Sequence, residues 1–378
     1  MNNKIYFEDL RYSDCAGSNF SFSKIKSFFR INNYTITEDI DEAGYIIFNT
    51  CGVFIEYEEL FFRDIEEVRK KYGQTKKIIV FWCLAWHSKK IWDICDYIIP
   101  TKKEKYFEDI FSFQIPFSEI SSILVNIDEN VGIRNTKYDE EKERYYLQVN
   151  RGCIHNCTYC GIKKSIGYVK SKPLDEIKQE VIFALNNNFK ELYIITDDIA
   201  SYWQDIGTNF AEMYNLIASF PWDYKININY AEPSEFMKWF PHIADNFYRV
   251  NSITYPIQSF NDRILKLMAR KYTVQDFIES VMQMRKYNES IVIRNHIIFW
   301  YPTEDFEEFR NNLLWVYIFD ESTFLLYSKI PGTKIFNESE YIKPQEIKKR
   351  IYAIYKLSKS NPRIYELYYR LADFLSHG

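Results

Sequence analysis

The sequence predicts an α/β protein with a small N-terminal parallel-sheet domain, a partial (β/α)6 TIM-like barrel and a short helical tail. Short apolar runs alternate with amphipathic helical patterns through most of the 378 residues, and this alternation favours parallel sheets covered by helices. The alternation pauses once, between residues 101 and 142. A chain of this length can build two hydrophobic cores. We therefore expect two α/β domains.

The N-terminal domain is expected to span residues 1–100. Its candidate strands are Ile5–Phe7, Tyr45–Phe48, Ile78–Trp82 and Tyr97–Ile99, and its candidate helices are Ser23–Asn32 and Glu56–Tyr72. Residues 101–142 show no strong period and lead into a charged run from Asp139 to Arg144. We interpret this stretch as a connector.

The barrel is expected to span residues 143–336 and to repeat strand and helix six times. The candidate strands are Tyr145–Val149, Glu191–Thr196, Lys225–Asn229, Ser252–Pro256, Ile291–Phe299 and Thr323–Ser328. The candidate helices are Leu174–Asn187, Asn209–Ser219, Asp262–Met268, Val274–Tyr287 and Glu304–Tyr317. Barrels of this kind carry their reactive groups at the carboxyl ends of the strands. The tail, residues 337–378, is expected to form helices at Pro344–Ser358 and Ile364–Phe374.

The strongest chemical signal is a run of three cysteines, Cys153, Cys157 and Cys160, in one short loop after the first barrel strand. Three thiolates at this spacing can ligate three irons of a [4Fe–4S] cluster and leave the fourth iron open to a reactant. A zinc ion is the alternative, with His155 as a conceivable fourth ligand. His155 is, however, too close to the flanking cysteines to complete a tetrahedron comfortably. The spacing favours the cluster.

A second set of cysteines, Cys15, Cys51 and Cys83, follows or ends predicted strands of the N-terminal domain. Ligands of a parallel sheet gather at the carboxyl edge of its strands, so these three thiols could converge on a second cluster. The alternative is three buried thiols that behave as small apolar side chains. Cys95 fits neither set, and we interpret it as a core thiol.

Composition limits the partners and the compartment. The chain has 48 Lys and Arg against 52 Asp and Glu, a net charge of −4, which argues against a large nucleic-acid footprint. No stretch approaches the roughly 20 apolar residues of a membrane span, and the N-terminus lacks the layout of a signal peptide. Seven cysteines without an export signal indicate a reducing compartment. We expect a cytoplasmic protein with no membrane partner.

The cysteine loop, in which Tyr159 precedes the last cysteine, resembles the CxxxCxxC motif of the radical S-adenosylmethionine (SAM) enzymes. The stretch from Pro256 to Tyr272 is similar to a motif of one branch of these enzymes, the radical SAM methylthiotransferases. The resemblance to that branch covers roughly residues 4–336.

The N-terminal cysteines carry the same resemblance. Asn49-Thr50-Cys51 is similar to a three-residue motif of the methylthiotransferase N-terminal domain, and Cys15 and Cys83 resemble the other two cysteine motifs of that domain. Asp14 and Trp82 stand where the family usually has glycine.

The resemblance implies two [4Fe–4S] clusters and SAM as cofactors. The thiols of the loop would hold the cluster that binds SAM. The thiols of Cys15, Cys51 and Cys83 would hold the second cluster.

The expected contacts of SAM and substrate are Tyr159, Thr196, Asp197, Asp198, Gln258, Ser259, Arg294 and Trp300. The resemblance places Tyr159 at the adenine and Thr196-Asp197-Asp198 at the SAM amino group, although the latter segment fits equally well a strand end that caps a helix. Arg294 is either a carboxylate clamp or a salt-bridged barrel residue. Trp300 and Thr303 replace two family glycines, and we expect Trp300 to stack on the ligand or to reshape the pocket.

The resemblance implies an enzyme that inserts a methylthio group at an unactivated C–H bond. Members that act on transfer RNA carry a basic C-terminal β-barrel, and the residues after Phe336 are too few and too helical for one. With the acidic charge balance, this favours a peptide or protein side chain, such as that of a ribosomally made peptide, over RNA. A tRNA methylthiotransferase and a non-catalytic, metal-stabilised binding protein are the alternatives. The expected partner is an electron donor such as flavodoxin or ferredoxin.

Overall fold

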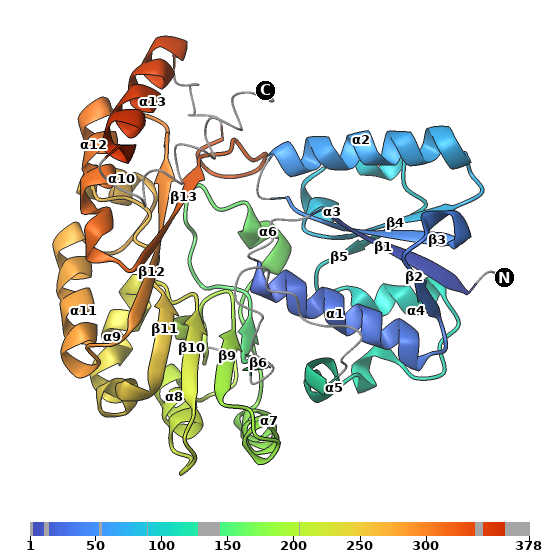
Figure 1. Ribbon diagram of the computed structural model, residues 1–378, viewed down its shortest axis with the longest axis horizontal. Helices are drawn as coiled ribbons and strands as arrows, with labels where there is room; N and C mark the ends of the chain where they lie inside the picture. The colour runs from blue at the N-terminus through green and yellow to red at the C-terminus, as the bar shows by residue number, and fades with distance from the viewer. Residues whose placement is uncertain are drawn as a thin grey trace.

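The computed structural model describes residues 3–10, 15–52, 55–88, 90–127, 144–203, 205–336 and 343–359. Within these ranges the chain forms two larger parallel sheets that lie next to each other, each covered by helices (Figure 1). The predicted α/β class, with an N-terminal parallel sheet and a partial barrel, is confirmed.

The N-terminal sheet contains five parallel strands in the order β2-β1-β3-β4-β5. They are β1 (Lys4–Leu10), β2 (Thr35–Thr37), β3 (Tyr45–Thr50), β4 (Lys77–Trp82) and β5 (Tyr97–Pro100). Helix α1 (Ala16–Ile31) packs on one face and α2 (Ile55–Tyr72) on the other. Because both faces are covered, successive residues of β3 are apolar: Ile47 packs with α1 and Ile46 with α2.

Residues 101–127, interpreted above as a connector, form short helices against this sheet. They are η3 (Glu104–Tyr106), α4 (Phe107–Ile110), η4 (Phe117–Glu119) and α5 (Ser122–Ile127). Phe107, Phe111 and Ile120 are buried in the same core as α1, so the N-terminal unit extends beyond residue 100. Residues 128–143 lie outside the described residues. The remaining short helices of this unit are η1 (Ile40–Glu42), α3 (Leu84–His87) and η2 (Lys90–Asp93).

The second sheet contains six parallel strands that follow chain order. They are β6 (Arg144–Gln148), β9 (Glu191–Ile195), β10 (Lys225–Asn229), β11 (Val250–Thr254), β12 (Val292–Phe299) and β13 (Glu321–Leu326). Each strand pairs with the next, and β6 and β13 form the two edges, so the barrel is open.

The outer face of this sheet is covered by helices whose apolar sides form the largest core (Figure 1). They are α7 (Leu174–Asn186), α8 (Phe210–Ala218), α9 (Pro233–Ile243), α10 (Asp262–Leu267), α11 (Val274–Tyr287) and α12 (Phe306–Leu314), with the short η5 (Ile199–Ser201), η6 (Ala244–Arg249) and η7 (Trp315–Ile318). The sequence did not predict α9, because Pro241 inside it reads as a helix breaker. The helix is held by its buried face, where Phe236 and Phe240 enter the core.

A small apolar cluster joins the two domains. Phe20 of α1 and Val125 of α5 pack against Tyr146 of β6 and Ile195 of β9. The backbone N–H of Tyr146 also donates to the Asn126 side-chain oxygen at 2.7 Å. The N-terminal unit is therefore packed directly on the first two strands of the barrel.

Helix α13 (Pro344–Ser358) packs against α12. Its Arg350 is fully buried, and its Nη1 lies 2.6 Å from Oε2 of Glu304, which follows β12. The predicted helix Ile364–Phe374 lies outside the described residues. Among the residues that the structure describes, no helix has the length and apolar character needed to cross a membrane.

Candidate metal centre

The cysteine loop starts from a tightly fixed backbone. It follows β7 (Asn150–Arg151), which pairs with β8 (Lys170–Ser171). Gly152 has φ +96°, and a Cβ placed there would lie 2.2 Å from the carbonyl oxygen of Tyr168. Only glycine fits both this conformation and this close approach. The Gly152 N–H donates to Oδ2 of Asp197 at 2.6 Å, which ties the loop to the end of β9.

The three loop thiols are half-buried and lie close enough together to interact electrostatically. Burial and the nearby Asp198 carboxylate, with contributions from Cys157 and Cys160, raise the pKa of Cys153 well above its usual value. Burial and the charge of Cys157 raise the pKa of Cys160 to about 11. Such thiols become thiolates when a metal neutralises their charge.

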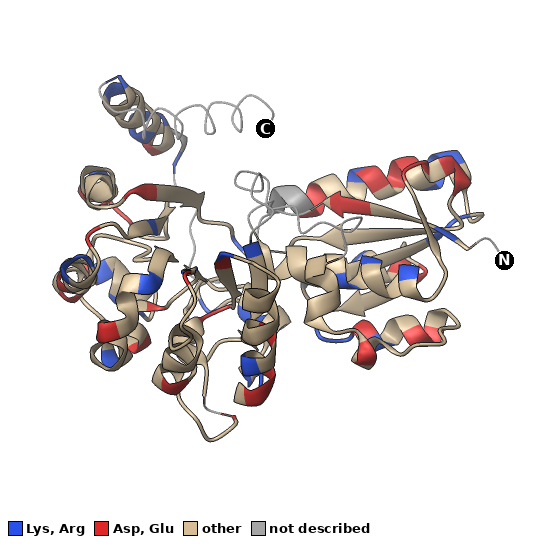
Figure 2. Ribbon diagram, turned by 60° about the horizontal axis from the view of Figure 1, so that its bottom comes forward, with Lys and Arg blue, Asp and Glu red and all other residues tan. Residues whose placement is uncertain are grey.

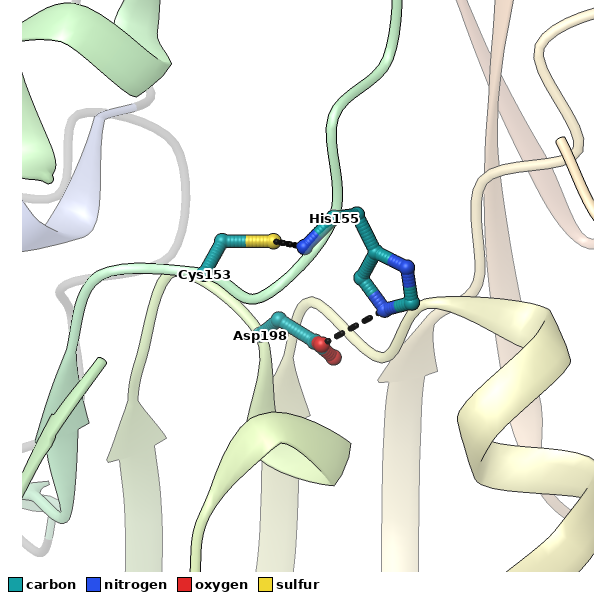
Figure 3. A group of neighbouring side chains, drawn as sticks. All are labelled: Cys153, His155 and Asp198. Atoms are coloured by element: carbon teal, nitrogen blue, oxygen red, sulfur yellow. Dashed lines mark hydrogen bonds and ion pairs between the residues drawn. The ribbon is translucent and has the colours of Figure 1, made fainter. Parts of the chain in front are cut away.

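The geometry of the loop argues against a single zinc ion. Among the described residues, the group of side chains whose ligand atoms lie within 4.8 Å of one another is Cys153, His155 and Asp198 (Figure 3). Cys157 and Cys160 are outside this group. A zinc site that used all three thiols would need a fourth ligand close to all of them, whereas three thiols suffice for three irons of a cluster.

His155 belongs instead to a buried network of charges. Its Nε2 lies 3.4 Å from Asp198 Oδ2 and 3.3 Å from Glu232 Oε2. Arg270 continues the network, because its Nη1 lies 3.0 Å from Glu232 Oε1 and its Nη2 donates to the Tyr159 hydroxyl at 2.8 Å. Tyr159, a predicted SAM contact, is thus oriented by a buried arginine.

Sequence reasoning missed Glu232 and Arg270 as site residues. Glu232 follows β10 by three residues, and this position at the carboxyl end of a strand was an available signal. Arg270 lies within the stretch from Pro256 to Tyr272 that carried part of the resemblance. Its pairing with Glu232 joins two distant segments and is visible only in three dimensions.

The predicted segment Thr196-Asp197-Asp198 lies at the end of β9, where its side chains fix the backbone. The Thr196 hydroxyl donates to the Asn150 side-chain oxygen and accepts from the Asp198 N–H. Asp197 holds Gly152, as described above. Asp198 caps η5 by accepting from the Ala200 N–H at 3.2 Å. These contacts agree with the capping alternative raised for this segment.

Gln258, Ser259 and Trp300 lie at the ends of β11 and β12. Gln258 has φ +77° and Trp300 has φ +61°, and the isolated bridge from Gln258 to Ile297 ties the two strand ends together. Ser259 is fully buried and donates to Asn312 of α12 at 3.3 Å. Gln258 Oε1 and Trp300 Nε1 are buried without a hydrogen-bond partner among the described residues. Unpaired buried polar atoms at this edge fit a bound polar ligand such as SAM.

Arg294 lies nearer the opposite end of the sheet. Its Nε is 2.9 Å from Glu321 Oε2, and its Nη1 donates to the Ser252 hydroxyl at 2.8 Å. The pair with Glu321 is the arrangement raised above as the salt-bridged alternative. At the same end of the sheet, Arg144 of β6 pairs with Glu191 of the neighbouring strand β9 at 2.9 Å.

The second set of cysteines comes together at the carboxyl edge of the N-terminal sheet. Cys15 precedes α1, Cys51 follows β3, and Cys83 follows β4 at the start of α3. Burial, followed by the charges of Cys51 and Cys15, raises the pKa of Cys83 well above its usual value. The three thiols therefore share one local environment. Asp14 lies outside the described residues.

Cys95 lies apart from both sets. Burial raises the pKa of its thiol to about 12, and its charged neighbours are Arg69 and Asp96 rather than other cysteines. It packs beside the core on the α2 face of the N-terminal sheet.

The segments that follow the loop cysteines and Cys83 meet at the domain junction. Helix α6 (Ile162–Ile166), which directly follows the loop, contacts α3, which begins after Cys83. The Ser165 hydroxyl of α6 donates to the Cys83 carbonyl oxygen at 3.5 Å, and the Thr101 hydroxyl donates to the Ser165 carbonyl oxygen at 2.5 Å.

Two family models match the chain: "Radical SAM superfamily" over residues 147–316 and "Uncharacterized protein family UPF0004" over residues 10–95. The chain is 31% identical to the ribosomal protein uS12 methylthiotransferase RimO of Sulfurihydrogenibium sp., covering 84% of this chain and 73% of the relative. The chain belongs to the radical SAM methylthiotransferase family. Methylthiotransferases of this family use SAM and two [4Fe–4S] clusters, so both predicted cofactors and the enzyme class are confirmed.

Relatives within the methylthiotransferase family act on two kinds of substrate. The uS12 methylthiotransferase RimO of Thermodesulfovibrio yellowstonii is 27% identical, over 89% of this chain and 80% of its own. The tRNA-2-methylthio-N(6)-dimethylallyladenosine synthase of Sulfurihydrogenibium sp. is 25% identical, over 86% and 77%. Among solved structures, the radical SAM methyltransferase TsrM of Kitasatospora setae, with cobalamin and a [4Fe–4S] cluster bound, superposes with a TM-score of 0.59 at 12% identity, covering 89% of this chain and 78% of that one. This last likeness shows the fold.

Proposed function

We propose that this methylthiotransferase inserts a methylthio group at an unactivated C–H bond of a peptide or protein side chain. In this proposal Cys153, Cys157 and Cys160 hold one cluster, and Cys15, Cys51 and Cys83 hold the other. The observation that supports it is the contact of α3 with α6, which joins the segment after Cys83 to the segment after the loop cysteines. When bound, SAM and the loop cluster supply a hydrogen-abstracting radical, and the N-terminal cluster supplies sulfur.

The chain's own residues then bind and orient the reactants. Asp197 fixes the start of the loop through the Gly152 N–H. Arg270 fixes the Tyr159 ring, which we place at the adenine. The unpaired side chains of Gln258 and Trp300 would bind polar atoms of SAM at the ends of β11 and β12.

The charge distribution supports a protein substrate over RNA. Figure 2 shows basic and acidic residues interspersed along the helices of both domains. Most arginines of the described residues pair with carboxylates of the same chain, as in Arg69–Asp96, Arg144–Glu191, Arg151–Asp197, Arg263–Glu308, Arg270–Glu232, Arg285–Asp320, Arg294–Glu321, Arg310–Glu307 and Arg350–Glu304. Nucleic-acid binding requires Lys and Arg that are available to phosphates.

The experiment uses the full chain, reconstituted anaerobically with iron and sulfide and reduced by dithionite or by flavodoxin or ferredoxin, the proposed electron donors. The variant C15A/C51A/C83A should still release 5′-deoxyadenosine from SAM but form no methylthio product. The variant C153A/C157A/C160A should lose both activities. Retention of methylthio product in the first variant would refute the assignment of its cysteines to the sulfur donor.

The substrate class is tested by mass spectrometry with two probes, purified ribosomal protein uS12 and bulk transfer RNA. We expect a methylthio group in place of hydrogen on the protein probe and an unmodified RNA. Modification of the RNA alone would overturn the protein assignment in favour of the tRNA alternative.

A further inference from the structure

Arg151 is a buried cation that lies between the two cysteine sets. It directly precedes the Gly152-Cys153 start of the loop, and only 13% of its side chain is exposed. Its Nε is 3.2 Å from Asp197 Oδ2 in the barrel, and its Nη1 donates at 3.1 Å to the Ser21 hydroxyl of α1, the helix that begins after Cys15. The guanidinium therefore bridges the domains beside the N-terminal thiols.

The third partner of Arg151 is Trp82, the residue before Cys83. The guanidinium carbon lies 4.8 Å from the centre of the Trp82 ring, a cation–π distance. Trp82 has φ +89°, a backbone conformation that strongly favours glycine. A bulky residue in this conformation is strained and persists only where its surroundings hold it. The Arg151 guanidinium supplies such a contact across the domain junction.

The charge of Arg151 lies next to the chain segments that carry the N-terminal thiols. Its aromatic partner Trp82 directly precedes Cys83. A Cβ placed on Gly17, two residues after Cys15, would lie 3.9 Å from the guanidinium carbon. The guanidinium is therefore adjacent to the backbone that holds two of the three thiols.

The cysteine loop contacts a different arginine. Arg270 donates to the hydroxyl of Tyr159, the residue before Cys160, at 2.8 Å. The guanidinium of Arg151 thus contacts the N-terminal domain, and that of Arg270 contacts the loop.

We propose that Arg151, held on the Trp82 ring, is a positioning residue that raises the reduction potential of the N-terminal cluster. A fixed positive charge next to a cluster stabilises its more negative, reduced form, and such nearby groups tune cluster potentials. This inference rests on the proposed assignment of Cys15, Cys51 and Cys83 to that cluster. It goes beyond that assignment, because Arg151 ligates no metal.

The test is a redox titration of the reconstituted full chain, monitored by electron paramagnetic resonance and repeated in the C153A/C157A/C160A background, where the N-terminal signal is isolated. We expect R151Q to shift the reduction equilibrium of the N-terminal cluster about tenfold toward the oxidised form, which is about 59 mV for one electron. R151K, which keeps the charge, should shift it less, and the loop cluster should keep its potential.

Arg144 provides a matched control. Its side chain is also 13% exposed, its guanidinium lies 2.9 Å from Glu191, and it stands over the Tyr193 ring at 5.6 Å. It is at the start of β6, whereas Arg151 follows the end of that strand. We therefore expect R144Q to leave both potentials unchanged.

Equal potentials in R151Q and R144Q, or an equal shift of both clusters in R151Q, would overturn the inference. If R151Q fails to retain two clusters, W82G is the second test, because glycine accepts the backbone conformation and removes only the ring. A lower reduction potential confined to the N-terminal cluster supports the inference. An unchanged potential refutes it. A wild-type iron content of about four per chain would refute both proposals. Two clusters without a methylthio product would refute the proposed function alone.

Discussion

Three residues keep a backbone conformation that the family normally assigns to glycine. Trp82, Trp300 and Thr303 occupy positions where the resemblance has glycine, and their φ values are +89°, +61° and +70°. From the sequence alone we expected Trp300 to stack on the ligand or to reshape the pocket. The structure shows the same left-handed region occupied by larger side chains, at an expected cost of about 1–3 kcal/mol each.

Thr303 allows this strain to be measured, because its side chain is exposed. We expect Thr303→Gly to stabilise the protein by about 1 kcal/mol, since it removes the strained φ and loses only an exposed hydrogen bond from Arg263. Chemical denaturation measures the change. Thr35→Gly, in an exposed strand position of β2, should destabilise instead. Equal destabilisation by both would refute the strain argument.

Glu304 should make stability depend on pH. Burial raises its pKa from an ordinary 4.5 to about 7, although Arg350 acts against burial. The folded state therefore binds the proton more tightly than the unfolded state. The resulting stability is fully present below about pH 4.5 and is lost as pH rises through about 7. We expect the free energy of unfolding of the wild type to fall by up to about 3 kcal/mol through this pH range. Glu304→Gln should remove this fall, so its melting temperature should decline less between pH 5 and 8.

Glu346 is the control for this experiment. It pairs with the same Arg350 at 3.1 Å, but its side chain is 31% exposed. Glu346→Gln should therefore leave the pH profile close to that of the wild type. A profile that E304Q does not alter would show that another group causes the decline.

At the scale of elements, the cysteine loop depends on one glycine. Alanine at position 152 would place a Cβ 2.2 Å from the Tyr168 carbonyl oxygen, and backbone cannot yield as a side chain can. We expect Gly152→Ala to cost at least about 2 kcal/mol of stability and to release the iron of the loop cluster. Denaturation and an iron count measure the two effects.

Gly161 offers the comparison within the same loop. A Cβ there would lie 2.7 and 2.8 Å from two methyl carbons of the Ile330 side chain, so a side chain rather than backbone would have to shift. Gly161→Ala should retain more iron than Gly152→Ala. The reverse order would contradict the assignment of Gly152 as the fixed point.

The strands were more predictable than the helices that cover them. Continuous apolar runs such as Ile78–Trp82 identified buried parallel strands, because both faces of the sheet are covered. Helix α9 escaped prediction, since Pro241 obscures its pattern and its stability comes from tertiary packing. The short helices of residues 101–127 also lack a periodic signal, and their aromatic side chains are ordered by contact with α1.

At the scale of the whole molecule, Phe20 is the test of the junction. It is 1% exposed and packs with Tyr146 and Ile195 of the barrel. We expect Phe20→Ala to cost about 3 kcal/mol and to separate the unfolding of the two domains into two calorimetric transitions. Phe28→Ala, buried wholly inside the N-terminal core, should weaken that domain without loosening the junction. A single transition in Phe20→Ala would argue against its role as a link between domains.

The sequence predicted cysteine ligands better than their surroundings, because ligand spacing is local and charge pairing is not. The motif of the loop is contained in eight consecutive residues, from Cys153 to Cys160. The network of Glu232 and Arg270 joins residues 38 apart in the chain, and no pattern in one sequence pairs them. Likewise, the hydrogen bond from the Ser165 hydroxyl to the Cys83 carbonyl oxygen depends on how the two domains pack together.

The contact of Arg151 with Trp82 also limits how this enzyme can be rebuilt from parts. One partner belongs to the barrel and the other to the N-terminal domain. A chimera that imports an N-terminal domain with glycine at the Trp82 position would leave a desolvated guanidinium without its aromatic face. Grafting experiments on this enzyme should therefore exchange both residues together.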